Sequence, residues 1–385
     1  MTSLRRMQMA AAGVGAAGSE LWAWGKNYQG ALGIGAAHNS HRSSPVQVGS
    51  DPEWSIISGG NHFAMGIRSD GSLWTWGQGS GGRLGVGNET HYSSPVQVGL
   101  DKDWTNIWGG YDTGRALKSD GTLWIWGGGG VGQNGDGTTT SRSSPIQVGG
   151  AGDNIWSSCG QSNALGYHTV ALKTDGTLWS WGLNDYGQLG LGDSGGGANR
   201  SSPVQIGNGT YWKKVMQGES HTIAIRTDNT VWSWGWGGVG QLGHGNTSNK
   251  SSPVQISSLG TSDWIDCGTG RYHSLIINQA GQLWGWGVNY GQLGIPAQYS
   301  NNLSTPMQVG SDTDHLRVYC GGEHSFIFRG IDVTDQLLYA CGRQYEGQLG
   351  DGTTTIRSSP HQIGSVAGEW ASAAGGEYAS YGLKA

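Results

Sequence analysis

The motif Trp-x-Trp-Gly recurs along the chain at intervals of 50 to 55 residues, and this period constrains the fold more than any other feature. A degenerate seventh copy lies at residues 339–342 and reads Tyr-Ala-Cys-Gly. A unit of this length in constant register predicts a repeat architecture, in which every unit forms one supersecondary element. The six regular copies begin at Trp22, Trp74, Trp124, Trp179, Trp232 and Trp284.

Two further motifs divide each unit into four segments with strand character. A Ser-Ser-Pro-Val-Gln segment or a variant follows each tryptophan motif, and a short apolar run such as residues 62–67 precedes it. Turn-forming dipeptides such as Asp70-Gly71 and Asp120-Gly121 separate these segments. Seven units of four short strands are typical of a propeller. We therefore predict an all-β fold, a seven-bladed β-propeller with four-stranded blades.

The phase of the repeat predicts how the ring closes. The sequence enters the repeat at the third and fourth strands of a unit, and its residues 369–384 supply only a first and a second strand. Because an open ring would expose unpaired strand edges, we expect the N-terminal and C-terminal hairpins to share one blade. We assign residues 20–385 to the propeller. The Ala/Gly-rich residues 1–19 are expected to form a tail that could serve as an attachment peptide.

Composition agrees with a β-rich chain and argues against several classes of function. The 73 glycines disfavour long helices, because glycine costs a helical position about 1 kcal/mol relative to alanine. The 22 basic and 27 acidic residues give a net charge of −5, and no basic run exceeds Arg5-Arg6, so we expect no nucleic-acid partner. No apolar run approaches the roughly 20 residues that cross a bilayer, so we expect no membrane insertion.

Together, these motifs resemble the repeat of the regulator of chromosome condensation family. The resemblance rests on Trp-x-Trp-Gly, Gly-Gln-Leu-Gly-x-Gly, the proline-led strand and Gly-Gly-x-His-Thr-x-Ala-Leu, and it covers roughly residues 20–384. It implies a seven-bladed propeller. The best-known activity in the resembling family is guanine-nucleotide exchange on a small GTPase, which uses a protruding hairpin. The intervals of 50 to 55 residues in this sequence leave no room for such a hairpin. Fold and activity are separable, so the resemblance says less about function.

We interpret the repeated tryptophans as wedge residues between adjacent blades. The two rings of each motif point to one face of the sheet, and each buries about 150 to 250 Å². A tryptophan-based ultraviolet sensor, as in a plant photoreceptor that resembles this family, is disfavoured because Gly-Trp-Arg-His-Thr is absent. Trp108, Trp156 and Trp236 lie outside the repeat register and are, with Arg5 and Arg6, the candidate partner contacts. The structural repeat tryptophans are Trp22, Trp24, Trp74, Trp76, Trp124, Trp126, Trp179, Trp181, Trp232, Trp234, Trp284 and Trp286.

Five histidines are assigned to one repeated position, where Asp112 and Tyr378 stand in the other two units. Blade spacing keeps them too far apart to share a metal ion at about 2.0 to 2.1 Å, so we expect hydrogen bonds to backbone in the next strand or blade. The four cysteines are expected to be free, because no Cys-x-x-Cys motif occurs. Glycine patterns such as residues 77–82 lead into loops and no helix, so we expect no cofactor. The histidines are His62, His168, His221, His273 and His324.

No nucleophile, base and orienting acid stand out against the repeat, so we predict a non-enzymatic interaction or structural scaffold. The favoured hypothesis is a bacteriophage virion component, in the capsid or a tail appendage. Its tail would bind other virion subunits, and its uncharged loops would contact the host or its glycans. The alternatives are a guanine-nucleotide exchange factor for a small GTPase and a glycan-binding lectin outside a virion. The expected location is the virion, or otherwise the cytoplasm.

Overall fold

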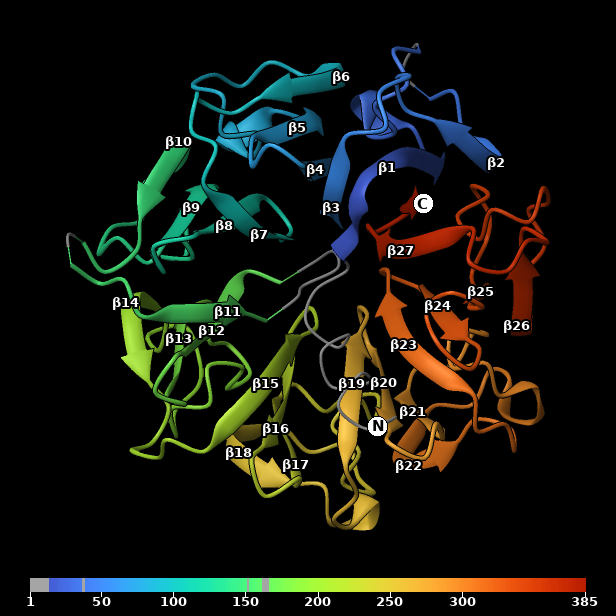
Figure 1. Cartoon of the computed structure of the whole chain (residues 1–385). Helices are drawn as coiled ribbons and strands as arrows, with labels where there is room; N and C mark the ends of the chain where they lie inside the picture. Colours follow the sequence, from blue (N-terminus) through green and yellow to red (C-terminus); the bar gives the residue numbers. More distant parts are fainter. Residues whose placement is uncertain (1–13, 37–38, 151, 161–165) are drawn as a thin grey trace.

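The computed structural model describes residues 14–36, 39–150, 152–160 and 166–385, and this part of the chain is built almost wholly of antiparallel strands. The strands form six sheets, five with four strands and one with eight. Figure 1 shows the sheets arranged around a common centre, with successive sheets following the order of the chain. The all-β propeller predicted from the repeat is therefore confirmed.

Within each four-stranded sheet the strands pair in the order in which they occur along the chain. We refer to them as the first to fourth strands of a unit. The five four-stranded sheets are β7 (Trp104–Gly109), β8 (Thr113–Lys118), β9 (Leu123–Gly127) and β10 (Arg142–Gln147); β11 (Trp156–Cys159), β12 (His168–Lys173), β13 (Leu178–Gly182) and β14 (Arg200–Gln205); β15 (Trp212–Gln217), β16 (His221–Arg226), β17 (Val231–Gly235) and β18 (Lys250–Gln255); β19 (Trp264–Thr269), β20 (His273–Asn278), β21 (Leu283–Gly287) and β22 (Leu303–Gln308); and β23 (His315–Cys320), β24 (His324–Arg329), β25 (Leu337–Gly342) and β26 (Arg357–Ile363).

The eight-stranded sheet joins the two ends of the described chain. Its β1 pairs with β28 over six consecutive residue pairs, from Glu20–Lys384 to Gly25–Ala379, and with β2 on its other side. An N-terminal extension of β1 also pairs with β3. The strands are β1 (Val14–Gly25), β2 (Arg42–Gln47), β3 (Trp54–Gly59), β4 (Phe63–Arg68), β5 (Leu73–Gly77), β6 (Tyr92–Gln97), β27 (Trp370–Gly375) and β28 (Ala379–Lys384). Four short 3-10 helices complete the described elements, namely η1 (Tyr28–Gly30), η2 (Ser80–Gly82), η3 (Ser257–Leu259) and η4 (Pro296–Gln298).

β1 begins inside the segment that the sequence assigned to a tail. Residues 14–19 belong to this strand, whereas residues 1–13, which include Arg5 and Arg6, lie outside the described part of the chain. The attachment peptide therefore stays a prediction.

The second tryptophan of each motif joins neighbouring units. These six side chains are fully buried, and each indole Nε1–H donates to a main-chain carbonyl in the long loop of the preceding unit. Trp234 donates to the Gln188 carbonyl at 3.0 Å, for example. In the seventh unit the Cys341 thiol takes the place of the indole and reaches the Gln292 carbonyl at 3.6 Å. The equivalent bonds are made by Trp24, Trp76, Trp126, Trp181 and Trp286.

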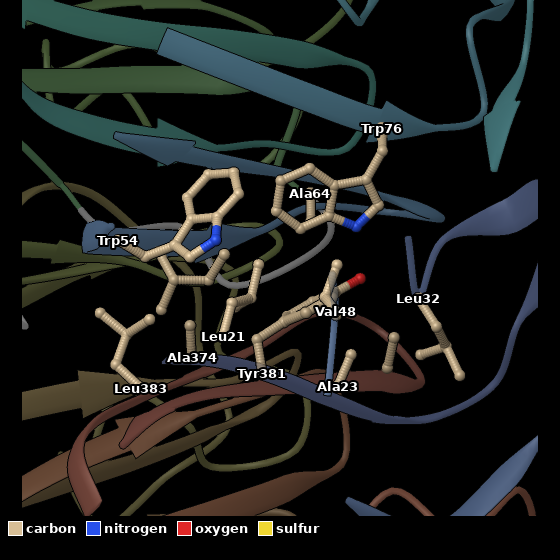
Figure 2. Close-up of a cluster of buried hydrophobic side chains, with 12 residues drawn as sticks. Leu21, Ala23, Leu32, Val48, Trp54, Ala64, Trp76, Ala374, Tyr381 and Leu383 are labelled. Carbon is tan, nitrogen blue, oxygen red and sulfur yellow. The ribbon is translucent and has the colours of Figure 1, made fainter. Parts of the chain in front are cut away.

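Figure 2 shows one of the resulting clusters between units. Trp54 and Trp76 of the β3–β6 group pack with Leu21 and Tyr381 of β1 and β28. The Trp76 indole and the Tyr381 hydroxyl both donate to the Ala31 carbonyl, at 3.0 and 2.7 Å. Apolar side chains and hydrogen bonds between units therefore lie in the same wedge. A donor or acceptor that lost its partner there would destabilise the fold, because water cannot replace the bond.

The first tryptophan has a different environment in five of the six regular motifs, where it shares a cation with another tryptophan. The second ring belongs to the first residue of the first strand, a repeated position that the sequence analysis did not recognise. The Arg226 guanidinium carbon, for instance, lies 3.5 Å from the Trp232 ring centroid and 4.7 Å from that of Trp212. Such contacts stabilise cation and rings together. The first-strand tryptophans are Trp54, Trp104, Trp156, Trp212, Trp264 and Trp370.

Four of the five predicted histidines form bonds between units, but not to backbone as expected. His221 Nε2 lies 3.2 Å from the Ser274 hydroxyl of the next unit, and that hydroxyl donates to the Gln241 carbonyl. Because the hydroxyl donates its own hydrogen to the carbonyl, it must accept from Nε2–H of the imidazole. Burial lowers the pKa of His221 to about 3. The same arrangement links His168 to Thr222, His273 to Ser325 and His324 to Ser380.

The four cysteines are free and buried, as predicted. Burial raises the pKa of the Cys159 and Cys267 thiols to about 12, so these groups stay protonated at neutral pH. Within the described ranges, no helix combines the length and the apolar character that crossing a bilayer requires.

We predict that the two tryptophans of one motif differ strongly in their contribution to stability. Trp234→Phe removes the indole bond to Gln188 and leaves a void between units, so it should lower the free energy of unfolding by about 2 to 4 kcal/mol. Trp232→Phe keeps a ring beneath Arg226 at a partly exposed position and should cost about 1 kcal/mol or less. Urea unfolding followed by circular dichroism measures both. Equal losses would contradict the wedge assignment.

The buried histidines should make the protein sensitive to acid. A histidine with a pKa near 3 when folded and near 6.5 when unfolded takes up a proton on unfolding, so stability falls as pH decreases through this window and is unaffected above it. Each such histidine contributes about 1.4 kcal/mol per pH unit. His221→Gln should therefore reduce the slope of stability against pH between 6.5 and 5 by about one proton. The exposed His361 provides the matched control for the exchange of histidine by glutamine, His361→Gln.

Candidate functional site

Turns and loops from many units meet at one end of the ring. The turn between the first and second strands of each unit lies beside the start of the long loop between the third and fourth strands. Main-chain bonds hold the two together, as where Lys26 N–H donates to the Tyr378 carbonyl at 2.9 Å and Gln78 N–H to the His62 carbonyl at 2.8 Å. We call this end of the ring the loop face.

A glycine at the end of the third strand makes this close approach possible. Gly77 has φ +102°, and a Cβ atom there would lie 2.5 Å from the His62 carbonyl oxygen. No side chain fits at that distance, and few residues other than glycine adopt this backbone conformation. The glycine that ends each Trp-x-Trp-Gly motif therefore aligns every long loop with its neighbouring turn.

A cavity of about 590 Å³ lies where these turns converge. Six turns between first and second strands contribute to its lining, so it lies centrally on the loop face; we call it the central cavity. Aromatic rings form much of its wall. His62 lies between Tyr28 and Tyr378, with ring centroids 4.7 and 6.3 Å away, and Tyr111 and Tyr167 pair at 4.6 Å. The cavity is within the size range of small-ligand sites.

The remaining lining is charged or carries amides. Glu219 accepts a hydrogen bond from Arg271 Nε at 2.7 Å, which neutralises both groups. The Glu377 residue is 8% exposed, and burial raises the pKa of its carboxyl. The amide side chains are Asn61 and Gln78. The side of the cavity near Arg271 thus mixes charges of both signs.

The opposite side has a positive corner formed by Lys26, His62 and Arg83. The Lys26 ammonium lies 4.7 Å from the Tyr378 ring centroid and 6.0 Å from that of Tyr28. Burial lowers the pKa of His62 to about 4, and the two neighbouring cations add to this shift, so the imidazole is neutral at pH 7. Among the described residues, neither Lys26 nor Arg83 has a carboxylate within ion-pair distance.

Arg83 occupies a position that holds glutamine in five other units. In these units the main-chain carbonyl accepts a hydrogen bond from the next unit, from an indole or, at Gln292, from the Cys341 thiol. Each glutamine Oε1 also accepts from the main-chain N–H two residues earlier in its loop, a bond that Arg83 cannot make. The Arg83 guanidinium donates to the carbonyls of Ser80 at 2.9 Å and Asn61 at 3.3 Å and to Gln78 Oε1 at 3.1 Å. All three acceptors are neutral, so the positive charge is not compensated by them. The matching glutamines are Gln133, Gln188, Gln241, Gln292 and Gln348.

Exposed aromatic residues surround the central cavity. Tyr186, Tyr290 and Tyr345 lie in long loops on the loop face, with 43%, 53% and 58% of their surface exposed. Trp236 continues this rim, 5.0 Å from Tyr272 and 6.1 Å from Tyr186 between ring centroids. Of the 14 tyrosines in the chain, eight lie in the cavity or on its rim, namely Tyr28, Tyr111, Tyr167, Tyr186, Tyr272, Tyr290, Tyr345 and Tyr378.

The structure corrects two of the predicted partner contacts. Trp108 is 9% exposed and Trp156 is 2% exposed, and both pack in the same core cluster between units. Trp156 is in fact the first-strand tryptophan of its unit, which an insertion before β12 moves out of the regular spacing. Only Trp236 of the three lies at the loop face, where it is partly exposed.

His62 was also assigned to the wrong position. Strand pairing places His168 and His221 opposite the glycine that ends the third strand, and Phe63 takes that place in the β3–β6 group. His62 therefore lies one residue earlier, in the turn, together with Asp112 and Tyr378. The double glycine before it conceals this one-residue difference in the sequence. His62 belongs to the central cavity and makes no bond of the kind described for His221.

The described residues contain no group of three or more histidine, cysteine, aspartate or glutamate side chains placed to hold a metal ion. The buried histidines pair with hydroxyls of neighbouring units. The arrangement of the loop face is thus one of aromatic rings, two cations outside ion-pair distance of a carboxylate and paired charges, which suits recognition by stacking and by charge-assisted hydrogen bonds.

The family model for the regulator of chromosome condensation (RCC1) repeat matches this chain in six segments that together cover more than half of it. The segments are residues 19–67, 70–114, 175–225, 228–277, 280–328 and 335–383. The chain belongs to the RCC1 repeat family. The unmatched stretch, residues 115–174, contains the insertion that displaces Trp156 from the regular spacing.

Curated relatives in this family have diverse names. The chain is 33% identical over 213 residues to the ultraviolet-B receptor UVR8 of Arabidopsis thaliana, a match that covers 53% of this chain and 46% of the relative. It is 30% identical over 225 residues to the probable E3 ubiquitin-protein ligase HERC3 of Homo sapiens, covering 57% of this chain and 20% of the relative. The matches span less than half the length of both relatives.

Solved structures share the fold at low sequence identity. Prp20p from Saccharomyces cerevisiae, described with its binding properties to Gsp1p and histones, has a TM-score of 0.84 at 17% identity. The alignment covers 98% of this chain and 94% of that one. Human WBSCR16 has a TM-score of 0.80 at 18% identity, with coverage of 95% and 98%.

We predict that the pKa of His62 reports the charge of the positive corner. Two-dimensional NMR titration should give a value of about 4 in the wild-type protein. Lys26→Gln and Arg83→Gln each remove a neighbouring cation and should raise this pKa. Lys250→Gln removes a charge from the outer strand β18 and should leave it unchanged. A pKa that none of these substitutions moves would show that the corner is not as described.

Proposed function

We propose that this RCC1-repeat propeller is a non-enzymatic scaffold that binds a protein partner through its loop face. The observation that carries the proposal is the contrast between conserved interior positions and varied surface positions within this one chain. Buried positions repeat from unit to unit, as the second tryptophans do. The turns at the loop face hold a different residue pair in each unit, such as Asn61-His62, Glu219-Ser220 and Arg271-Tyr272. The repeated buried residues maintain the ring. The turn residues that differ from unit to unit form the surface on which recognition would depend.

The composition of the loop face supports protein binding. Protein interfaces are enriched in tyrosine, tryptophan and arginine, and the binding energy concentrates in a few such residues. Tyr290, Tyr345 and Trp236 are exposed or partly exposed in rigid loops whose starts are fixed by main-chain bonds. Rigid aromatic side chains lose little conformational entropy on binding, which favours their use as anchors.

We also propose that the ring consists of seven four-stranded blades and is closed by the two hairpins. Two observations support this. The eight-stranded sheet divides at β1 into the group β27, β28, β1 and β2 and the group β3 to β6, each with the strand order of the other sheets. The β1–β28 pairing is as regular as the pairing of neighbouring strands elsewhere, with six consecutive residue pairs.

The narrower form of the proposal places the chain in a bacteriophage virion, in the capsid or a tail appendage. It is supported by the Ala/Gly-rich residues 1–19 and by the solvent-exposed tips of the long loops, such as 137–141 and 245–249, which are rich in Ser, Thr and Asn. Such loops suit contact with host proteins or glycans. Mass spectrometry of purified virions tests this form directly, and a virion without the chain would exclude it.

Two alternatives remain from the sequence. An exchange factor for a small GTPase would accelerate nucleotide release in an assay with a panel of GTPases, and a lectin would bind a glycan array. The lengths of the repeat units argue against the first, since no long hairpin is inserted in the described loops. Either positive result would replace the scaffold proposal.

The proposal predicts that partner binding depends on one end of the ring. A triple substitution at the loop face, Tyr186→Ser, Tyr290→Ser and Tyr345→Ser, should weaken binding at least about tenfold, because exposed tyrosines act as hot spots. The matched control changes three exposed apolar residues at the opposite end, by Leu100→Ser, Ile331→Ser and Val366→Ser, and should bind as the wild type does. Quantitative affinity capture followed by titration with the purified partner measures both. Loss of binding in the control alone would contradict the assignment.

A further inference from the structure

The positive corner of the central cavity combines features that no other part of the described loop face shows together. Lys26 and Arg83 flank the neutral His62, and neither cation is paired with a carboxylate. Both side chains are partly buried, and at such sites an ion pair is worth more than in bulk water. A ligand that brings a negative charge would supply the missing compensation.

The Arg83 guanidinium is fixed in advance. Nε and Nη1 donate to the neutral acceptors of Ser80, Asn61 and Gln78, whereas Nη2 has no acceptor among the described residues. Burial lowers the pKa of Arg83, but the group remains charged at neutral pH. A planar donor that is already oriented suits phosphate and carboxylate oxygens and loses little entropy on binding.

Lys26 is held differently, by ring faces alone. Its ammonium lies over Tyr378 and Tyr28, and no acceptor for Nζ is found among the described residues. Contacts of a cation with aromatic rings are weaker than a charge-assisted hydrogen bond, so the ammonium can turn toward an anion at little cost. The nearby carboxyl of Glu377 lies outside ion-pair distance, as does Asp112 near Arg83, and burial raises the pKa of both carboxyls.

The wall beside these cations is aromatic. The rings of Tyr28, His62 and Tyr378 adjoin one another, and the pair of Tyr111 and Tyr167 faces the same cavity. Planar ligands bind such walls by stacking. The volume of about 590 Å³ admits a ring with its substituent.

We infer that the central cavity binds an aromatic oxyanion, whose phosphate or carboxylate group pairs with Lys26 and Arg83 and whose ring stacks on the tyrosine wall. The ligand could be a free small molecule or a group at the surface of a docked partner, since both would present the same chemistry. The inference goes beyond partner docking, because it assigns a ligand to the isolated chain.

The experiment titrates phenyl phosphate into the full chain by isothermal calorimetry. Arg83→Gln and Lys26→Gln should each weaken binding about tenfold or more, because each removes a charge-assisted contact. Both substitutions are mild: five other units carry glutamine at the position of Arg83, and the β3–β6 group carries Gln78 at the position of Lys26. Thermal unfolding confirms that the variants are folded. Lys250→Gln, which removes the same charge from the outer strand β18, should bind as the wild type does.

Further probes separate the parts of the inference. Inorganic phosphate should bind more weakly than phenyl phosphate, and cresol, which has the ring without the charge, should not compete. Benzoate binding more tightly than phenyl phosphate would assign a carboxylate, and the reverse a phosphate. The inference is overturned if phenyl phosphate fails to bind at about 10 mM, if the double variant binds it unchanged, or if inorganic phosphate binds equally well. These measurements need no partner, so their failure is distinguishable from failure of the partner-binding experiment.

Discussion

The bond from a buried indole to a loop carbonyl of the preceding unit determines much of this structure. Trp234 reaches the Gln188 carbonyl, and Thr222 donates its hydroxyl to the same oxygen. The next unit therefore binds the carbonyl of each long loop, at a point where apolar side chains are also buried. Breaking the indole bond would leave a polar group unpaired in the core, which costs more than the bond itself contributes. The packing of one unit on the next and the position of its loop are consequently fixed together.

This arrangement leaves the side chains of the loop free to differ. The acceptor is a main-chain carbonyl, so the bond between units does not depend on which side chain occupies the position. Arg83 shows the consequence, because its carbonyl accepts the Trp126 indole as a glutamine carbonyl does elsewhere, while its guanidinium reaches the central cavity. A chain built of near-identical units can thus acquire an asymmetric site while the bond between units is kept. The separation is physical: the main-chain carbonyl of Arg83 binds the next unit, whereas its side chain lines the central cavity.

Most of the fold could be predicted from the sequence, because the period, the turn dipeptides and the tryptophan motif all act locally and agree with one another. Trp156 was misassigned because the insertion in its unit lengthens the distance to Trp179 to 23 residues. In other units the distance is 20, as between Trp54 and Trp74, and counting back from each motif would have revealed the first-strand tryptophans. The position of His62 needed the strand register, which a double glycine leaves ambiguous.

The central cavity could not be predicted, because its residues are brought together only by closure of the ring. Lys26 and His62 are 36 positions apart in the sequence and come from different four-stranded groups. Arg83 belongs to the same group as His62 and lies in its long loop, between β5 and β6. No local pattern records that these three groups will share a corner or that their charges will lack partners. Repeats do, however, make the exceptions visible: in five units the glutamine side chain accepts a hydrogen bond from a main-chain N–H of its own loop, and Arg83 replaces this neutral acceptor with a cation. In a repeat protein, a charged residue at a position that holds a neutral amide in most other units is therefore an indication of binding, and Arg83 satisfies this condition.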